Sequence, residues 1–291
     1  MATAPRPDDA PPAGGEVRVV VTKAWRWALV APVALALLTF VIQARLAGGP
    51  AAARADAAET ALAFAAAGAG CLAAALAFAS GDYMRRAWGF MSACDLLLML
   101  KPLLFGSDGR YFPRSPASPA ALASGAITVA ANLSFLIGMV LVGRAWKVAG
   151  LDLRVSRRVR LGASFASIAF ALLVAGGGAW QSARSLAGGR LASLSPLASA
   201  AGDIASLAVL APIVLTALAL RGGALAWPWA ALALSTLGWL LFDSLGATTQ
   251  FFDVAIPFEH PLQEALRVFA CACAFVAGLL QRAVLRRAEG P

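Results

Sequence analysis

Long apolar stretches alternate with short polar segments along the chain, and this pattern predicts its elements. Eight stretches are each about 20 residues long, which is the length that an α-helix needs to cross the hydrocarbon core of a membrane. They cover residues 25–44, 59–80, 87–106, 121–143, 161–181, 203–221, 226–247 and 263–283. Backbone groups in lipid have to hydrogen bond within their own segment, so each stretch is predicted to be helical. The pattern therefore predicts an all-α, polytopic membrane protein with about eight transmembrane helices.

Three short sequence motifs recur at a nearly constant spacing. They are Leu-Ala-Gly-Gly at 46–49 and 186–189, Ala-Trp at 87–88 and 226–227, and Phe-x-x-Gly at 135–138 and 275–278. Landmarks that keep their order at one offset indicate an internal duplication. Since each half holds an even number of helices, both copies insert in the same orientation, and we expect two parallel four-helix repeats.

The duplication predicts the domain organisation. Residues 1–22 are polar and rich in Pro and Ala, and we expect a disordered cytoplasmic tail there. The two membrane repeats follow at 23–147 and 161–287, with a basic cytoplasmic joint at 148–160. The first apolar stretch is predicted to be an uncleaved helix, because it lacks a small-x-small cleavage site and its copy at 161–181 lies in mid-chain.

The composition agrees with a membrane protein. Hydrophobic residues make up 60% of the chain and charged residues 13%, and the mean hydropathy is +0.76. A soluble domain contains about 45–50% apolar and about 25% charged residues. The chain is therefore expected to have the lipid bilayer as its main surroundings.

Two independent patterns orient the helices. If the N-terminus lies in the cytoplasm, the inside segments hold 16 of the 24 Lys and Arg residues, so the positive-inside rule places both termini there. Six of these cations lie between Arg144 and Arg160, where we expect them to set the topology beside anionic lipid and not to bind nucleic acid. Six of the eight Trp residues fall at predicted cytoplasmic helix ends, as interfacial aromatic belts do. We expect a multi-pass protein of the bacterial inner membrane.

Ionisable and polar residues within the apolar stretches are the candidate site residues, because placing them in lipid is costly. Asp95 lies seven residues past Trp88, roughly 10 Å along its helix. Asn132 lies at mid-depth on the next helix and could face Asp95. Asp243 lies near the outer end of its helix, and His260 lies at the outer mouth, as a pH sensor or a solvated loop residue. Each aspartate is compatible with a proton or ligand site and with a structural hydrogen bond between helices.

Several classes of chemistry are not expected. A single histidine excludes bis-histidine haem and zinc sites built on several histidines. The four cysteines lie inside apolar stretches and are expected to pack as small apolar residues. The chain contains no phosphate loop, no His-Glu-x-x-His motif and no Gly-x-Ser-x-Gly nucleophile elbow. We therefore expect no enzyme, no cofactor and no metal.

One part of the chain resembles a known family. The matching words are Ala226-Trp227-Pro-Trp229, Leu237-Gly238-Trp239-Leu-Leu-Phe-Asp243, a proline-bearing loop, the exit Leu280-Gln-Arg282, and Arg85-Arg86-Ala87-Trp88 in the first half. They resemble the multi-helix membrane modules found N-terminal to bacterial diguanylate cyclases and histidine kinases. The resemblance implies a sensor whose helices transmit a signal. Because this chain carries no kinase or cyclase domain, it also implies a separate cytoplasmic signalling partner.

Three functions stay open at the level of sequence. The first is a sensory or regulatory protein, with its input near Asp243, Phe258 and His260 and its output at 144–160 and the basic C-terminal end. The second is a transporter of a small solute or ion, because parallel repeats and the intramembrane Asp95 suit alternating access. The third is a structural subunit that binds other subunits of a membrane complex.

Overall fold

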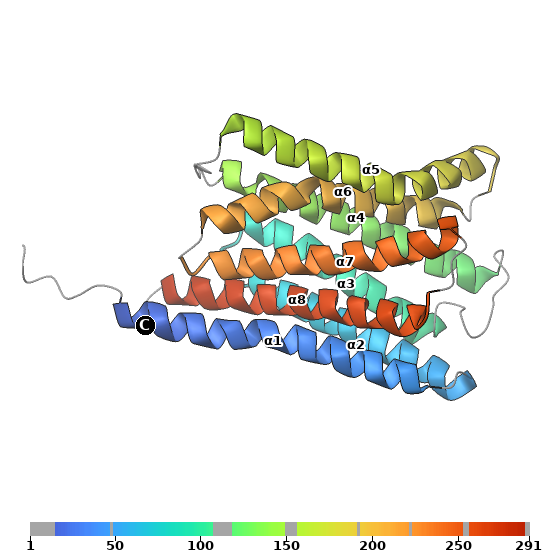
Figure 1. Ribbon diagram of the computed structural model, residues 1–291, viewed down its shortest axis with the longest axis horizontal. Coiled ribbons are helices and arrows are strands. Elements are labelled where there is room, and N and C mark those ends of the chain that lie inside the picture. Colours follow the sequence, from blue (N-terminus) through green and yellow to red (C-terminus); the bar gives the residue numbers. More distant parts are fainter. Residues whose placement is uncertain are drawn as a thin grey trace, which may run out of the picture.

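The computed structural model describes residues 15–46, 49–106, 118–148, 156–190, 193–220, 223–252 and 256–288, and these ranges form eight α-helices. They are α1 (Gly15–Arg45), α2 (Gly49–Ala75), α3 (Tyr83–Phe105), α4 (Pro119–Val148), α5 (Arg157–Ala187), α6 (Leu194–Ala219), α7 (Ala226–Phe252) and α8 (Glu259–Ala288). The helices lie side by side along the long axis of the molecule (Figure 1). Each is long and apolar enough to cross a membrane, which confirms the predicted all-α polytopic fold.

Successive helices run in opposite directions, so the connections gather at two ends of the bundle. The α1–α2, α3–α4, α5–α6 and α7–α8 connections lie at one end, on the right in Figure 1, which we call the α1–α2 end. The other three connections lie at the opposite, α2–α3 end. There Asp82 caps α3 by accepting a 2.7 Å hydrogen bond from the Met84 backbone N–H. The cytoplasmic location of the α2–α3 end stays a prediction.

Helix α8 is central to the packing, because it contacts α1, α2 and α7. It approaches α2 so closely that a Cβ atom on Gly278 would overlap the carbonyl group of Gly70. Contacts of this kind between small residues let transmembrane backbones pack tightly. Helix α5 lies at the edge of the bundle, where it packs mainly on α6 and buries little of its surface.

The helix contacts follow the expected duplication only in part. The pairs α2–α3, α3–α4 and α2–α8 correspond to α6–α7, α7–α8 and α6–α4 when every helix is advanced by four. The first helices differ, since α1 packs on α8 whereas α5 packs on α6. The two-repeat organisation therefore stays a prediction, and so do the domain boundaries. Helix α1 begins within the predicted 1–22 tail, and residues 1–14 and 149–155 lie outside the described ranges.

All helices except α7 begin earlier than hydropathy indicates, and in three of them the earlier start brings a polar residue of the site region inside the helix. Helix α2 begins at Gly49 and not at 59, α6 at Leu194 and not at 203, and α8 at Glu259 and not at 263. The early turns contain polar side chains that lower the hydropathy, but their Ala-rich and Leu-rich composition still favours a helix. As a result, Asp203 lies well inside α6, and His260 lies in the first turn of α8 and not in a loop.

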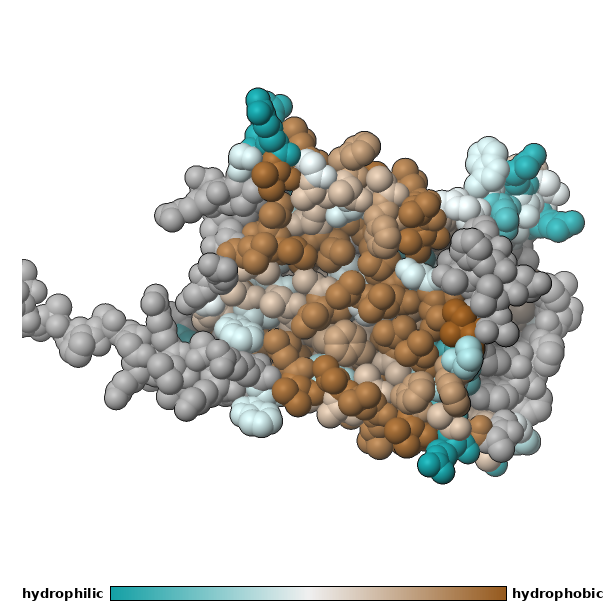
Figure 2. Space-filling model, in the orientation of Figure 1, coloured by the Kyte–Doolittle hydropathy of each residue, from teal (hydrophilic) through white to brown (hydrophobic). Residues whose placement is uncertain are grey.

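The outer surface suits a lipid environment. Apolar side chains cover the middle of the face shown in Figure 2, and polar ones gather toward the two ends. Large side chains such as Leu37, Phe165 and Leu173 are 63%, 74% and 79% exposed on the outside of the helices. Apolar exposure on this scale is unfavourable in water, and it is the surface that a hydrocarbon environment requires.

Candidate functional site

A cavity of about 250 Å³ lies inside the bundle, lined by α2, α3 and α4 of the first half and by α6, α7 and α8 of the second. Its polar lining consists of Asp56, Thr60, Asp95, Lys101, Thr128, Asn132, Ser199, Asp203, Asp243 and Arg267. The cavity lies toward the α1–α2 end, because Gly106, which ends α3, and Ser199, in the second turn of α6, both line it. Pockets for drug-sized ligands measure roughly 300–1,000 Å³, so this cavity suits a smaller solute.

Two carboxyl groups meet in the cavity wall. Asp203 on α6 and Asp243 on α7 lie close enough for their side chains to hydrogen bond to each other. An ionised carboxylate can only accept hydrogen bonds, so a hydrogen bond between the two groups would require a proton on one of them. The pair can therefore hold either a shared proton or another cation, and a cation that replaces the proton would leave both groups ionised.

Asp95 lies on a neighbouring part of the wall, on α3. Its Oδ2 atom is 3.9 Å from the Sγ atom of Cys71 on α2, within the reach of a weak hydrogen bond from the thiol. Gly68 leaves room for this arrangement, because a Cβ atom there would lie 2.9 Å from the Leu96 side chain and 3.4 Å from the Cβ atom of Asp95. The close approach of α2 and α3 therefore positions the Asp95 carboxyl group.

Asn132 on α4 has a defined place in the same cavity. Its Nδ2 atom donates a 2.9 Å hydrogen bond to the Thr128 carbonyl oxygen, one turn earlier in the helix. Its Oδ1 atom lies beside Gly202 of α6, where an added Cβ would approach it to 2.7 Å. Asn132 and Asp95 therefore line one cavity, and the close approach to Gly202 places the Asn132 side chain beside the part of α6 that carries Asp203.

Two cationic side chains share the wall with the carboxylates. Lys101 lies on α3, and Arg267 lies on α8 with its guanidinium 5.5 Å from the ring centre of Phe242. Arg267 donates hydrogen bonds to the Thr60 hydroxyl and, at 2.9 Å, to the Glu264 carboxylate. Since Glu264 is not part of the lining, much of the Arg267 charge is balanced by a group behind the wall.

The lining therefore offers carboxyl groups that can pair with a positively charged guest. It contains four aspartates, one of which, Asp56, lies beside His260, and two cationic side chains, of which Arg267 is paired with Glu264. Aromatic rings complete it: Trp239 stacks on Phe64 at 5.9 Å and contacts Phe242 edge to face at 5.6 Å. The faces of such rings attract cations, and Trp does so most strongly.

The cavity is closed toward the α2–α3 end. The half of the bundle near that end is filled by a core cluster whose largest members include Trp88, Met139, Ile213 and Leu232, each at most 4% exposed. Close packing of this kind leaves no room for a solute. Within the described part of the chain, a guest would therefore reach the carboxylates from the α1–α2 end.

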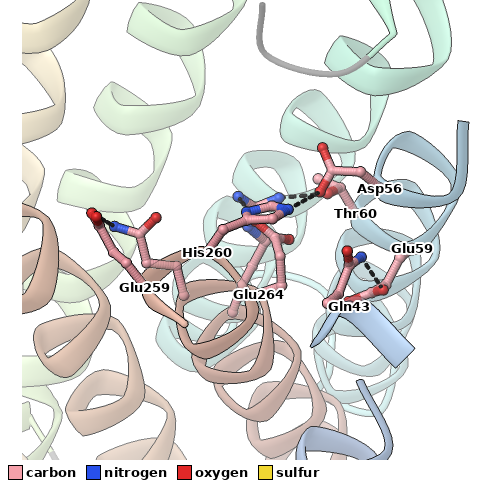
Figure 3. A network of polar contacts seen from close by, with 9 residues as sticks. Gln43, Asp56, Glu59, Thr60, Glu259, His260 and Glu264 are labelled. Atoms are coloured by element: carbon pink, nitrogen blue, oxygen red, sulfur yellow. Dashed lines mark hydrogen bonds and ion pairs between the residues drawn. The ribbon is translucent and has the colours of Figure 1, made fainter. Parts of the chain in front are cut away.

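A polar network lies beside the cavity at the α1–α2 end and joins α1, α2 and α8 (Figure 3). Gln43 of α1 donates a 2.8 Å hydrogen bond to Glu59 of α2. His260 of α8 lies between two carboxylates, with Nε2 3.9 Å from Asp56 Oδ1 and Nδ1 3.6 Å from Glu264 Oε1. Asp56 belongs both to this network and to the cavity lining, so the two features share a wall.

The structure brings together most of the site residues predicted from the sequence. Asp95, Asn132 and Asp243 line the same cavity, and His260 lies behind it, next to Asp56. The sequence reading missed Asp203, because the predicted start of its helix placed it at the membrane surface. The only sign of Asp203 in the sequence was a carboxylate within an Ala-rich stretch. Its importance follows from its proximity to Asp243, which the sequence does not show.

Comparisons with known proteins leave the function to be argued from this geometry. Searches against protein-family models, curated proteins and solved structures find no match for this chain. The resemblance to sensor modules therefore stays a prediction. Three observations bear on function. The cavity is lined by helices from both halves of the chain, its lining contains more carboxyl groups than cationic groups, and the core cluster around Trp88 closes it toward the α2–α3 end.

Proposed function

We propose that this protein is a membrane transporter that binds a small organic cation in the cavity between its two halves. One observation carries the proposal: a carboxylate-rich cavity, closed toward the α2–α3 end by packed side chains of the described residues, lies within the bundle of apolar helices. Ionisable groups inside membrane proteins mark the paths of substrates, ions or protons, because they are too costly to retain without such a role. Secondary transporters place their substrate sites near the membrane midplane, between the two halves of the fold.

The acid pair has a defined part in this proposal. A cation that enters the cavity displaces the proton shared by Asp203 and Asp243 and pairs with the two carboxylates, while Trp239 and Phe242 cover its apolar portion. Release of a proton on binding links the solute to a proton gradient. The core cluster around Trp88 and Met139 has to open if the cation is to be released at the α2–α3 end.

Binding is tested first, on purified full-length protein in mild detergent. The probes are guanidinium, choline and tetramethylammonium, with acetate as the anionic comparison. We expect at least one cation to raise the thermal unfolding temperature and to change the fluorescence of Trp239, which lines the cavity. Acetate should do neither. Failure of every cation would contradict the proposal.

The acid pair is then tested by substitution. Asp203→Asn and Asp243→Asn keep the size of the side chain but remove a charge. Each should weaken cation binding about tenfold or more, because a hydrogen bond to a charged group contributes about 1.5–3 kcal/mol. The control is Asp82→Asn, which lies at the other end of α3 and retains a helix-capping side chain. Equal binding by all three variants would show that the acid pair does not hold the cation.

Uptake distinguishes transport from sensing. Radiolabelled guanidinium is suitable because it stays charged and crosses lipid slowly. Proteoliposomes with the unaltered protein should accumulate it when the interior is acidic, because protons that leave through the acid pair are exchanged for the entering cation, and those with Asp243→Asn should not. Binding without uptake would favour the sensory function, for which α8 is the suitable element, since it leads from the cavity to Arg286 and Arg287 at the opposite end.

A further inference from the structure

A cluster of metal-ligating side chains lies at the α1–α2 end, next to the cavity. Asp56 of α2 and His260 and Glu264 of α8 each offer one ligand atom, and these atoms all lie within 4.8 Å of one another. Ligand atoms at about 2.1 Å from a tetrahedral ion lie about 3.4 Å apart. The 3.6 and 3.9 Å separations involve different nitrogens of His260, Nδ1 toward Glu264 and Nε2 toward Asp56, and an ion binds only one of them. Rotation of the imidazole to direct a single nitrogen between the two carboxylates, within the 4.8 Å cluster, would form the site.

The helices place these three groups for local reasons. His260 and Glu264 are one turn apart on α8, so both side chains lie on one face of the helix. That face meets α2, which presents Asp56 (Figure 3). Further along the same interface, Gly70 and Gly278 hold the two helices at close range. The cluster is therefore built on two rigid helices, as a metal site requires.

Arg267 orients one carboxylate of the cluster. Arg267 donates to Glu264 at 2.9 Å and also to the hydroxyl of Thr60, which fixes the orientation of the Glu264 carboxylate. Carboxylates that bind metals are themselves oriented by hydrogen bonds of this kind. A carboxylate has two oxygens and about four acceptor positions, so the contact with Arg267 leaves capacity for an ion.

The negative charge of the carboxylates near the cluster also favours a bound cation. Asp56 is 6% exposed and Glu264 is 1% exposed, and Glu59 adds a third carboxylate one turn after Asp56. Arg267 lies beside Glu264, and His260 lies between Glu264 and Asp56. Buried carboxylates are costly unless positive charge accompanies them, and a divalent ion would add to the charge of Arg267.

We propose that Asp56, His260 and Glu264 bind a divalent transition-metal ion such as Zn²⁺, which joins α8 to α2 beside the cavity. One imidazole and two carboxylates form a donor set that suits Zn²⁺ and similar ions, and water completes the coordination. A single histidine excludes sites built on several histidines, but not a site in which carboxylates supply the other ligands. The inference is independent of the solute proposed for the cavity, although Asp56 lies between the two sites.

The test uses the full-length protein, freed of any polyhistidine tag and treated with EDTA. After equilibrium dialysis against Zn²⁺ at fixed pH, metal content is measured by mass spectrometry and the unfolding temperature by tryptophan fluorescence. We expect one Zn²⁺ per chain and a higher unfolding temperature with metal than without it. Absence of stoichiometric Zn²⁺ would overturn the proposal, and would leave a protonated His260 as the cation between the carboxylates.

Matched variants assign the ligands. His260→Gln and Asp56→Asn leave the Arg267–Glu264 pair in place, and each should weaken Zn²⁺ binding by at least about tenfold. Glu259→Gln is the control: it also alters α8 beside His260, but its carboxylate faces Gln263 and not the cluster. Two variants at different helices guard against a failure of one to fold. If both bound Zn²⁺ like the unaltered protein, the ion would lie elsewhere, for example at the buried cysteines.

Discussion

At the scale of single residues, the bundle depends on how its buried polar groups find partners. Gln43 is only 3% exposed, and its amide donates to Glu59 across the α1–α2 interface. A partly buried carboxylate such as Glu59 that loses a donor keeps its desolvation cost without compensation. The polar residues near the α1–α2 end therefore act together, and each is expected to matter through its neighbours.

Gln43→Leu is expected to lower the free energy of unfolding by about 1–3 kcal/mol, because Glu59 loses its donor. The double variant with Glu59→Leu should recover much of this loss, since both polar partners are then replaced by apolar groups. Thermal unfolding in detergent, followed by tryptophan fluorescence, measures both changes. Leu37→Ala on the lipid-facing surface of the same helix, where the side chain is 63% exposed, is the control. A Gln43→Leu protein as stable as the unaltered one would contradict this account.

At the scale of helices, close contacts between small residues determine the depth and rotation of each helix relative to its neighbours. Helices α2 and α8 meet at Gly70 and Gly278, and the same two helices carry Asp56, His260 and Glu264 nearer the α1–α2 end. A shift of either helix would separate these side chains. The packing of the two glycines is therefore a condition for the polar network as well as for stability.

Gly278→Ala is expected to destabilise the protein by about 1–3 kcal/mol or more, because its Cβ would overlap the backbone of Gly70. Gly178→Ala on α5 is the matched control. A Cβ there meets nothing within 4 Å, and alanine favours a helix more than glycine does. Unfolding temperatures of the two variants should therefore move apart, with Gly278→Ala lower and Gly178→Ala unchanged or higher. Equal values would show that α2 and α8 can separate without cost.

At the scale of the whole molecule, orientation in the membrane decides which side supplies the cavity. The distribution of Lys and Arg predicts that the α2–α3 end is cytoplasmic, so the cavity would open to the periplasm. Under the proposed function, the packed core cluster around Trp88 and Met139 would then separate the cavity from the cytoplasm.

Cysteine labelling tests this orientation. Cys71, Cys94, Cys271 and Cys273 are all buried, so introduced surface cysteines can be labelled selectively. In spheroplasts, a membrane-impermeant maleimide should label Arg190→Cys at the α1–α2 end and not Ser80→Cys at the other end. Both should react after the membrane is permeabilised. The reverse pattern would place the cavity on the cytoplasmic side.

Much of the architecture could be predicted without coordinates, and much of the site could not. Asp95, Asn132 and Asp243 stand out as polar residues in apolar helices, and all three line the cavity. Asp203 and Asp56 were overlooked, because polar neighbours lowered the hydropathy of their helix starts, which moved one predicted boundary to Asp203 and the other past Asp56. Boundaries judged from hydropathy measure affinity for lipid, whereas a helix also continues through polar turns whose side chains bond within the bundle.

By itself, the sequence determined that the chain forms eight helices long and apolar enough to cross a membrane, because the length and composition of each stretch decide its affinity for lipid locally. Tertiary structure alone decided which polar groups meet: Asp203 with Asp243, and Asp56 with His260 and Glu264. These side-chain contacts depend on the rotation and depth of each helix relative to its neighbours. Helices that are apolar on every side carry almost no periodic signal for rotation. Close packing at sites such as Gly70 and Gly278 supplies that information, and it exists only once the helices have assembled.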